Sequence, residues 1–288
     1  MKGSLLAEKA LVKHDWPLVD KGGLKVICAP LLSQFDNLAH AFTTRTGGQS
    51  QPPLQWFNLG RHWPDEQSRE DALINRRRLC QALGLADWTE RLTVPGQKHT
   101  TNIHVIDPHQ TTGNQLLMDR DGAATDATGY PILLHFADCV PVIIFDPKRA
   151  ALCVVHAGWK GTAGGISRLA VQLLCDKFNC RTENICAAIG PAIGSCCYPT
   201  GDDVAQQLCS SVEHGESLIA KGDGQPRPDL KAVNAMQLLE SGVEQIDVSS
   251  WCTACRPDIF YSHRQAKGQT GRQGALACIT QSAANKGN

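Results

Sequence analysis

The chain has 288 residues, of which 42% are hydrophobic and 19% are charged, and its formal net charge is zero. This length suits one larger mixed α/β domain, so residues 1–288 are expected to form a single domain. A neutral chain lacks the positive excess that binds nucleic acid or an anionic membrane surface, so we expect neither partner. A small and neutral substrate is the better expectation.

Strand-like and helix-like segments alternate along the chain. Short apolar runs bounded by turn residues predict buried strands at 24–28, 131–136, 141–145, 151–155 and 185–189, and 91–94 is also strand-like. Helical patterns occupy 65–83, with Gly84 at the end, and 165–178, 202–212 and 230–240. The stretch 221–228 is interpreted as an exposed loop between two helices. These elements predict an α+β (mixed α/β) fold class, with layered sheets flanked by helices.

The N-terminal segment lacks the features of an export signal. Lys2, Glu8, Lys9 and Lys13 interrupt it, so no apolar core of a signal peptide forms. No apolar run reaches the roughly 20 residues that span a bilayer. A cytoplasmic protein is therefore expected.

Thirteen cysteines are many for this length, and the number is odd. Cytoplasmic cysteines remain reduced, and most of these lie in apolar stretches, where they serve as small core residues, such as Cys153, Cys175, Cys186 and Cys278.

Two chemically active residues stand at the ends of neighbouring predicted strands. Cys139 lies between the runs 131–136 and 141–145, and His156 ends the run 151–155 before a glycine-flanked turn. A third candidate, His99, follows the strand-like segment 91–94. Three nitrogen or sulfur ligands with one open position are typical of a catalytic zinc site. Spacing alone also allows a core histidine and an inert core cysteine.

Several longer phrases give this sequence a resemblance to a known family. They include His40-Ala-Phe-Thr-Thr-Arg-Thr-Gly-Gly48, Phe57-Asn-Leu-Gly60, Gln97-Lys-His99, Asp121-Gly, Thr125-Asp126, Ala137-Asp-Cys-Val-Pro141, His156-Ala-Gly-Trp-Lys-Gly161, Gly190-Pro-Ala-Ile-Gly-Ser-Cys-Cys-Tyr198 and Tyr261-Ser-His-Arg264. From about His40 to Ile279 the chain resembles the YfiH-like family, also called the laccase-domain or multicopper polyphenol oxidase family.

The resemblance implies a zinc site and a fold. In that family the histidine of Gln-x-His, the cysteine of Ala-Asp-Cys and the histidine of His-Ala-Gly-Trp bind zinc, which implies His99, Cys139 and His156 as catalytic metal ligands here. The implied fold is the YfiH-like one, similar to that of the cytotoxic-necrotizing-factor deamidases. Two positions depart from the family pattern: Thr100 replaces a glycine, and the phrase 261–265 lacks a second arginine.

Arg45 and Asn58 are the candidate substrate contacts. Arg45 stands among small residues and glycines, where backbone N–H groups and a guanidinium can hold phosphate, and we expect it to be catalytic as well. Asn58 is a candidate for orienting a ribose hydroxyl, although an asparagine beside glycine also serves as a local backbone cap.

The function that the resemblance implies is zinc-dependent purine nucleoside phosphorolysis. Relatives in the family phosphorolyse adenosine, inosine and guanosine, cleave methylthioadenosine and deaminate adenosine, so purine nucleoside and phosphate are the expected partners. Zinc suits the deaminase reaction, because a bound water with a lowered pKa can attack C6 of adenine. The sequence does not rank these reactions or give an oligomeric state.

Other functions remain as alternatives. A copper-dependent polyphenol oxidase, with copper as cofactor, needs a multi-copper cluster with many imidazoles, and the chain has ten histidines and three methionines. A thiol hydrolase would use Cys139 with His156 or His99. Some relatives are called peptidoglycan editing factors, which is compatible with a catalytic activity.

Four more cysteines invite a second interpretation. Cys196, Cys197, Cys252 and Cys255 suggest a second metal site or a redox pair, but one C-x-x-C without a partner pair is a modest signal. We interpret them as reduced structural cysteines near the rim of the site, and expect one zinc ion for each chain.

Overall fold

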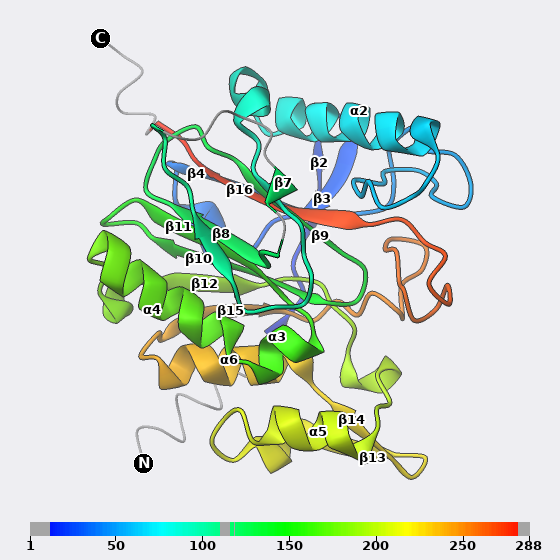
Figure 1. Cartoon of the computed structure of the whole chain (residues 1–288), viewed down its shortest axis with the longest axis vertical. Helices are drawn as coiled ribbons and strands as arrows, with labels where there is room; N and C mark the ends of the chain where they lie inside the picture. Colours follow the sequence, from blue (N-terminus) through cyan, green and yellow to red (C-terminus); the bar gives the residue numbers. More distant parts are fainter. Residues whose placement is uncertain (1–11, 110–115, 118, 282–288) are drawn as a thin grey trace.

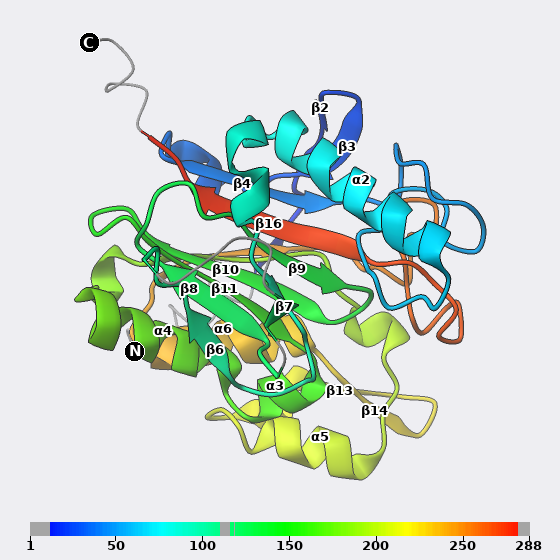
Figure 2. The same ribbon diagram turned by 45° about the horizontal axis from the view of Figure 1, so that its top comes forward.

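The computed structural model describes residues 12–109, 116–117 and 119–281. Two β-sheets lie face to face, with helices on both outer faces (Figure 1). Helix α2 (Glu66–Ala82) covers one side, and α4 (Ile166–Phe178) and α6 (Leu230–Glu240) cover the other (Figure 2). The predicted α+β class of layered sheets flanked by helices is therefore confirmed.

The larger sheet has seven strands and mixed directions. Their order is β1 (Lys13–His14), β15 (Gln245–Ser249), β12 (Cys186–Ile189), β10 (Val140–Asp146), β11 (Ala151–Ala157), β8 (Gly122–Thr125) and β6 (Ile103–Val105). β10 and β11 form an antiparallel hairpin at the centre, whereas β12 and β15 run parallel to each other.

The smaller sheet has five strands, and every neighbouring pair is antiparallel. Their order is β2 (Leu18–Lys21), β3 (Leu24–Ile27), β4 (Leu38–Thr43), β16 (Gln273–Ile279) and β9 (Ile132–Phe136). A short parallel pair, β5 (Val94–Pro95) with β7 (Leu116–Leu117), forms a two-stranded sheet of its own, and Thr93 before β5 bridges to Ile132 in β9.

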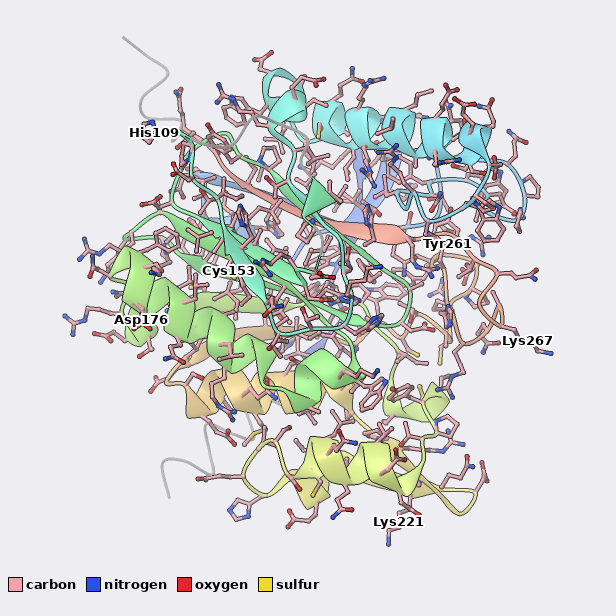
Figure 3. The ribbon with its side chains drawn as sticks, in the orientation of Figure 1. His109, Cys153, Asp176, Lys221, Tyr261 and Lys267 are labelled. Atoms are coloured by element: carbon pink, nitrogen blue, oxygen red, sulfur yellow. The ribbon has the colours of Figure 1, made fainter. Side chains whose placement is uncertain are left out.

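Alternation along β10 explains why its sheet is buried on both faces. Ile143 and Phe145 pack toward the smaller sheet, whereas Val142 and Ile144 pack toward the α4 and α6 side. Since successive strand side chains point to opposite faces, an uninterrupted apolar run can fill two separate cores. Cys153 in β11 lies in the core on the helix side, as expected for a small core residue (labelled in Figure 3).

The helices begin and end where the local chemistry predicts. The carboxylate of Asp65 accepts a hydrogen bond from the Ser68 N–H at the start of α2, and Gly84, with a φ of +72°, follows its end. The shorter helices α3 (Trp159–Ala163) and α5 (Asp202–Cys209) follow β11 and the loop after β12. Short 3₁₀ helices complete the list: Leu32–Gln34, Ala86–Arg91, Thr182–Asn184, Ser195–Cys197 and Gly215–Leu218.

Most predicted elements are confirmed within a few residues. The strands predicted at 24–28, 131–136, 141–145, 151–155 and 185–189 correspond to β3, β9, β10, β11 and β12. The four helices correspond to α2, α4, α5 and α6, although α5 ends at Cys209 rather than at 212. The strand-like segment 91–94 is confirmed in part, because Thr93 bridges to Ile132 and β5 begins at Val94, whereas a 3₁₀ helix extends to Arg91.

The loop expected at 221–228 is instead part of a β-hairpin. β13 (Ile219–Gly222) pairs with β14 (Gln225–Pro228), and Asp223 and Gly224 form the two-residue turn, both at positive φ. Asp-Gly is a favoured sequence for such a turn, because both positions need the left-handed conformation. The Asp-Gly pair in the sequence indicates this hairpin, although the proline and glycine content of 221–228 suggested an irregular loop.

No helix within the described residues is long and apolar enough to cross a membrane. The segment on which the cytoplasmic expectation depends lies, up to residue 11, outside the described residues.

His40, buried in β4, predicts a pH dependence of stability. Its Nε2 accepts a hydrogen bond from the Ala29 N–H at 3.0 Å, and burial lowers the pKa of His40 from 6.5 to about 4. Because the unfolded chain binds the proton more tightly, the stability present above pH 6.5 is lost as the pH falls toward 4, by about 3 kcal/mol.

The measurement is the denaturant unfolding free energy between pH 7 and pH 4. We expect His40→Gln to show a weaker pH dependence than the wild type, whereas His14→Gln, at an exposed position, should follow the wild type. Identical pH profiles for wild type and His40→Gln would contradict this account.

Candidate metal centre

The register of two antiparallel strands brings Cys139 and His156 together. Cys139 directly precedes β10, and His156 lies near the end of β11, where it pairs with Pro141. The start of one strand and the end of its antiparallel neighbour meet at the same edge of the sheet. His99 reaches this edge from the loop between β5 and β6.

The three side chains point at one small volume. One ligand atom from each of His99, Cys139 and His156 lies within 4.8 Å of the others, and Cys139 Sγ is 3.8 Å from His99 Nε2. The two imidazole rings are 5.1 Å apart at an angle of 67°. His156 is buried, Cys139 is half-buried and His99 is exposed, so the site is rooted in the sheet and open on one side.

A carboxylate that the sequence analysis did not assign organises this site. Asp121 is fully buried, and its Oδ1 accepts hydrogen bonds from His156 Nδ1 at 2.8 Å and from the His99 N–H at 3.0 Å. Its Oδ2 accepts from the N–H groups of Lys98 and Thr100 and from the Thr100 hydroxyl. Asp121 therefore fixes the loop that carries His99 and leaves Nε2 of His156 to face Cys139.

Thr100, which departs from the family pattern, has a local role here. Its N–H and its hydroxyl both bind Asp121 Oδ2, at 2.7 and 2.9 Å. A glycine would keep only the first of these bonds.

The charges of the site are mutually stabilising. Burial raises the pKa of Cys139, but His156 and His99 outweigh it and lower this pKa to about 6. Burial likewise opposes charge on His156, but Cys139 and Asp121 raise its pKa to about 9. Hydrogen bonds from His156 and Thr100 overcome burial and lower the pKa of Asp121 to about 2. A thiolate thus faces an imidazolium, whose Nε2 must release its proton before it can bind a metal.

Unusual backbone conformations present two of these residues. His99 has a φ of +60° and Asp138, next to Cys139, a φ of +87°, a region that non-glycine residues rarely adopt. Asp138 is held there by hydrogen bonds from the Thr253 hydroxyl and the Arg264 N–H to its carboxylate, each at 2.7 Å. Gln97 exchanges two hydrogen bonds with the backbone of His135 and so fastens the His99 loop to β9.

Gly158 is required by close approach. A Cβ at this position would lie 2.7 Å from His99 Cδ2 and 3.2 Å from Cys139 Sγ. The glycine that follows His156 and Ala157 therefore leaves room for the other two side chains of the site.

The donor set fits a zinc ion. Two imidazoles and one thiolate, with one side open, match a catalytic zinc site with three protein ligands. Asp121, bonded to His156 Nδ1, supplies the carboxylate that commonly orients a metal-binding histidine. These residues would hold the ion through His99, Cys139 Sγ and His156 Nε2.

Arg45 and Asn58 occupy other loops. The guanidinium of Arg45 donates to the carbonyl oxygens of Gln55 and Pro257 and stacks on Tyr261, which lies in the segment between β15 and β16 (Figure 3). Arg45 therefore ties loops together.

Asn58, the expected ribose contact, has no exposed surface. Its amide bonds with the N–H and carbonyl of Gly60 and with the Arg272 N–H. This is the alternative of a local backbone cap.

Arg272 is a cation that the sequence analysis did not consider. Burial lowers the pKa of Arg272, while the charges of Cys139 and Asp138 act in the opposite direction. The same guanidinium lowers the pKa of both His62 and His135, in addition to the effect of their burial. The lowered pKa values keep His62 and His135 neutral, and Arg272 is the cation of this group whose charge acts on Cys139.

Comparison with known proteins identifies the family. A family model described as multi-copper polyphenol oxidoreductase laccase matches residues 39–280. The chain belongs to this laccase-domain family, as its motifs indicated.

Relatives and solved structures agree with this assignment. A protein of Geobacillus stearothermophilus named purine nucleoside phosphorylase YlmD is 37% identical over 83% of this chain and 89% of its own length. The Bacillus subtilis protein of the same name is 32% identical over 93% and 94%. The crystal structure of the Bacillus licheniformis hypothetical protein YfiH superposes with a TM-score of 0.83 at 32% identity, covering 92% of this chain and 99% of that one.

Asp121 should control metal affinity. In Asp121→Asn the amide cannot accept all the hydrogen bonds that the carboxylate receives, and its NH₂ group would face N–H donors. We expect metal affinity at this site to fall tenfold to a hundredfold.

The measurement is the zinc retained after dialysis against graded chelator concentrations. Asp119→Asn, at an exposed neighbouring position with a φ of +58°, serves as the matched control and should behave as the wild type. Equal retention by the two variants would show that Asp121 only stabilises the fold.

Proposed function

We propose that this protein is a zinc-dependent purine nucleoside phosphorylase of the cytoplasm, acting on adenosine, inosine and guanosine. The observation that carries the proposal is the convergence of His99, Cys139 and His156 within 4.8 Å at an open edge of the sheet. The names of the relatives, purine nucleoside phosphorylase, support the substrate class. Adenosine deamination and methylthioadenosine phosphorolysis are further proposed activities of the same site.

Phosphorolysis makes specific demands on the protein. The bond between C1′ of the ribose and the purine nitrogen breaks, a phosphate oxygen bonds to C1′, and the departing base takes up a proton. Zinc, when bound, supplies a Lewis acid that polarises a substrate atom. His99, Cys139 and His156 would hold the ion, and Asp121 keeps the His156 ring in one orientation.

Phosphate needs a cation close to the metal centre. Arg45 was the expected residue, but three of its N–H groups donate to backbone carbonyls. Arg272 is electrostatically linked to Cys139, and its Nη1 donates to the carbonyls of Thr270 and Gly271, which hold one end of the guanidinium. We therefore assign phosphate to Arg272 and a loop-tying role to Arg45.

A thiol hydrolase is the second candidate, and one observation favours it. Asp121, His156 and Cys139 form a carboxylate–imidazole–thiolate series in which Asp121 orients the ring and the pKa of Cys139 is lowered to about 6. Such a series activates a cysteine nucleophile. One imidazole suffices as the base of such a series, whereas the zinc site requires both His156 and His99. An activity that survives chelator treatment would favour the hydrolase.

The polyphenol oxidase alternative rests on the family description. All ten histidines lie within the described residues, and there only His99 and His156 join a group of three or more metal-binding side chains. A cluster of several copper ions needs more imidazoles than these two.

Cys139→Ala should abolish both zinc binding at this site and nucleoside turnover. Removing the thiolate leaves two imidazoles, whereas a cysteine-to-alanine change lowers stability only modestly. The measurements are elemental zinc and copper content, inosine phosphorolysis and circular dichroism. Cys153→Ala, in the adjacent buried strand, is the control and should keep zinc and activity. Turnover retained by Cys139→Ala, or stoichiometric copper with a copper–thiolate absorption band in the wild type, would overturn the proposal.

The two arginines can be separated by kinetics. Arg272→Gln should raise the KM for phosphate tenfold to a hundredfold, equivalent to about 1.5–3 kcal/mol for a charged hydrogen bond, and leave adenosine deamination nearly unchanged. Lysine should restore little, because an ammonium lacks the planar fork. Arg45→Gln should lower thermal stability and affect both reactions alike. If Arg45→Gln alone impairs phosphorolysis selectively, phosphate binds at Arg45, as the sequence suggested.

A further inference from the structure

Four cysteines from two distant segments meet beside the metal centre. Cys196 and Cys197 follow β12 in a 3₁₀ turn, and Cys252 and Cys255 follow β15. β12 and β15 are parallel neighbours, so the loops after them leave the same edge of the sheet. A bridge between Ala192 and Cys252 continues the pairing of the two segments beyond the strands.

The four sulfur atoms are packed as closely as the ligands of one ion. All lie within 4.8 Å of one another. Cys196 Sγ is 3.7 Å from Cys252 Sγ and 3.5 Å from Cys255 Sγ, and Cys197 Sγ is 3.4 Å from Cys255 Sγ. Four thiolates in a tetrahedron about 2.3 Å from a zinc ion would be about 3.8 Å apart.

Other uses of four cysteines fit these distances less well. A disulfide needs sulfurs about 2.05 Å apart, and all four of these cysteines are free thiols. A four-iron cluster binds each thiolate to a different iron atom, which spreads the sulfurs farther apart than one shared ion does. A single tetrahedral ion is the species that matches the spacing.

Hydrogen-bond donors and cations surround the four sulfurs and would balance the charge of a metal-bound cluster. One ion of charge +2 with four thiolates carries a net charge of −2. The Gly194 N–H donates to Cys252 Sγ at 3.2 Å. Lys231 is 1% exposed, donates to the carbonyls of Ser249 and Trp251, and is electrostatically linked to Cys252 and Cys196. Arg227 donates to the Cys196 carbonyl.

We propose that Cys196, Cys197, Cys252 and Cys255 form a second, structural zinc site. It fastens the loop after β12 to the loop after β15. Thr253, between two of the ligands, donates its hydroxyl to Asp138, which precedes Cys139, and the Ile193 N–H donates to the Asp138 carbonyl. The second ion therefore stiffens the wall that presents Cys139. This replaces the interpretation of the four residues as reduced structural cysteines, and it does not rest on the proposed function.

The first test needs no change in the cysteine cluster. Full-length wild type, purified without added copper, should contain two zinc ions per chain, and Cys139→Ala should retain one. X-ray absorption of the zinc in Cys139→Ala should show a shell of four sulfurs at about 2.3 Å. One zinc per wild-type chain with none in Cys139→Ala, residual zinc bound to nitrogen or oxygen, or iron in its place would overturn the proposal.

The second test removes one of the four thiolates. Cys255→Ser should lose one zinc equivalent and melt at a lower temperature than the wild type, while Cys209→Ser, a half-buried cysteine outside the cluster, should keep both ions. Cys255→Ser with two zinc ions would refute the site. A different result is expected if only the first site, at His99, Cys139 and His156, held no zinc. The wild type would then contain one ion, which Cys139→Ala would keep and Cys255→Ser would lose. This pattern would contradict the proposed zinc-dependent function but support the four-cysteine site. If Cys255→Ser does not fold, the first test still decides.

Discussion

One buried carboxylate holds the metal centre together. Asp121 has no exposed surface and receives five hydrogen bonds, from the backbone of residues 98–100, the Thr100 hydroxyl and the His156 ring. An ion buried without partners is destabilised by several kcal/mol, so these donors are what permit a charged carboxylate here. The same carboxylate binds both the loop of His99 and the ring of His156. A movement of either histidine would therefore break hydrogen bonds to Asp121. Cys139 comes to this pair through strand register and through the left-handed backbone of Asp138, which Thr253 and Arg264 hold.

The candidate metal centre and the four-cysteine cluster are each assembled by one kind of strand pairing in the larger sheet. Antiparallel β10 and β11 place Cys139 beside His156, and parallel β12 and β15 place Cys196 and Cys197 beside Cys252 and Cys255. Asp138 joins the two, since its carboxylate accepts from Thr253 and it is the residue before Cys139. The left-handed backbone of Asp138 is thus held by the segment that carries the cysteine cluster, so rigidity at one group is transmitted to the other.

The sequence predicted best those elements whose signal is local. Unbroken apolar runs gave β10 and β11, and capping residues gave α2. β16 was not predicted, because Gly274, Ala275 and Ala277 carry little strand signal, yet small residues are what fit between its neighbours: a Cβ at Gly274 would lie 2.7 Å from Leu133. The three proposed metal ligands, which the structure brings together, followed from motif resemblance. The role of Asp121 and the four-cysteine cluster could not be predicted in this way, because both depend on which strands are neighbours. Nothing in the local sequence shows that cysteines more than 50 positions apart lie together.

His99 decides between the two chemistries that the site allows. Asp121, His156 and Cys139 alone would make an activated thiol, with the thiolate and the imidazolium stabilising each other. A nucleophilic thiolate needs open space on its far side for the substrate. Here His99 stands 3.8 Å from the sulfur, held in a left-handed conformation by hydrogen bonds to Asp121 at residues 98–100, and Gly158 leaves it room. The left-handed loop places a second imidazole against the thiolate; a zinc site uses both imidazoles as ligands, whereas a thiol nucleophile needs only one as its base. The second imidazole is therefore the feature that supports the proposed metal site over the thiol nucleophile.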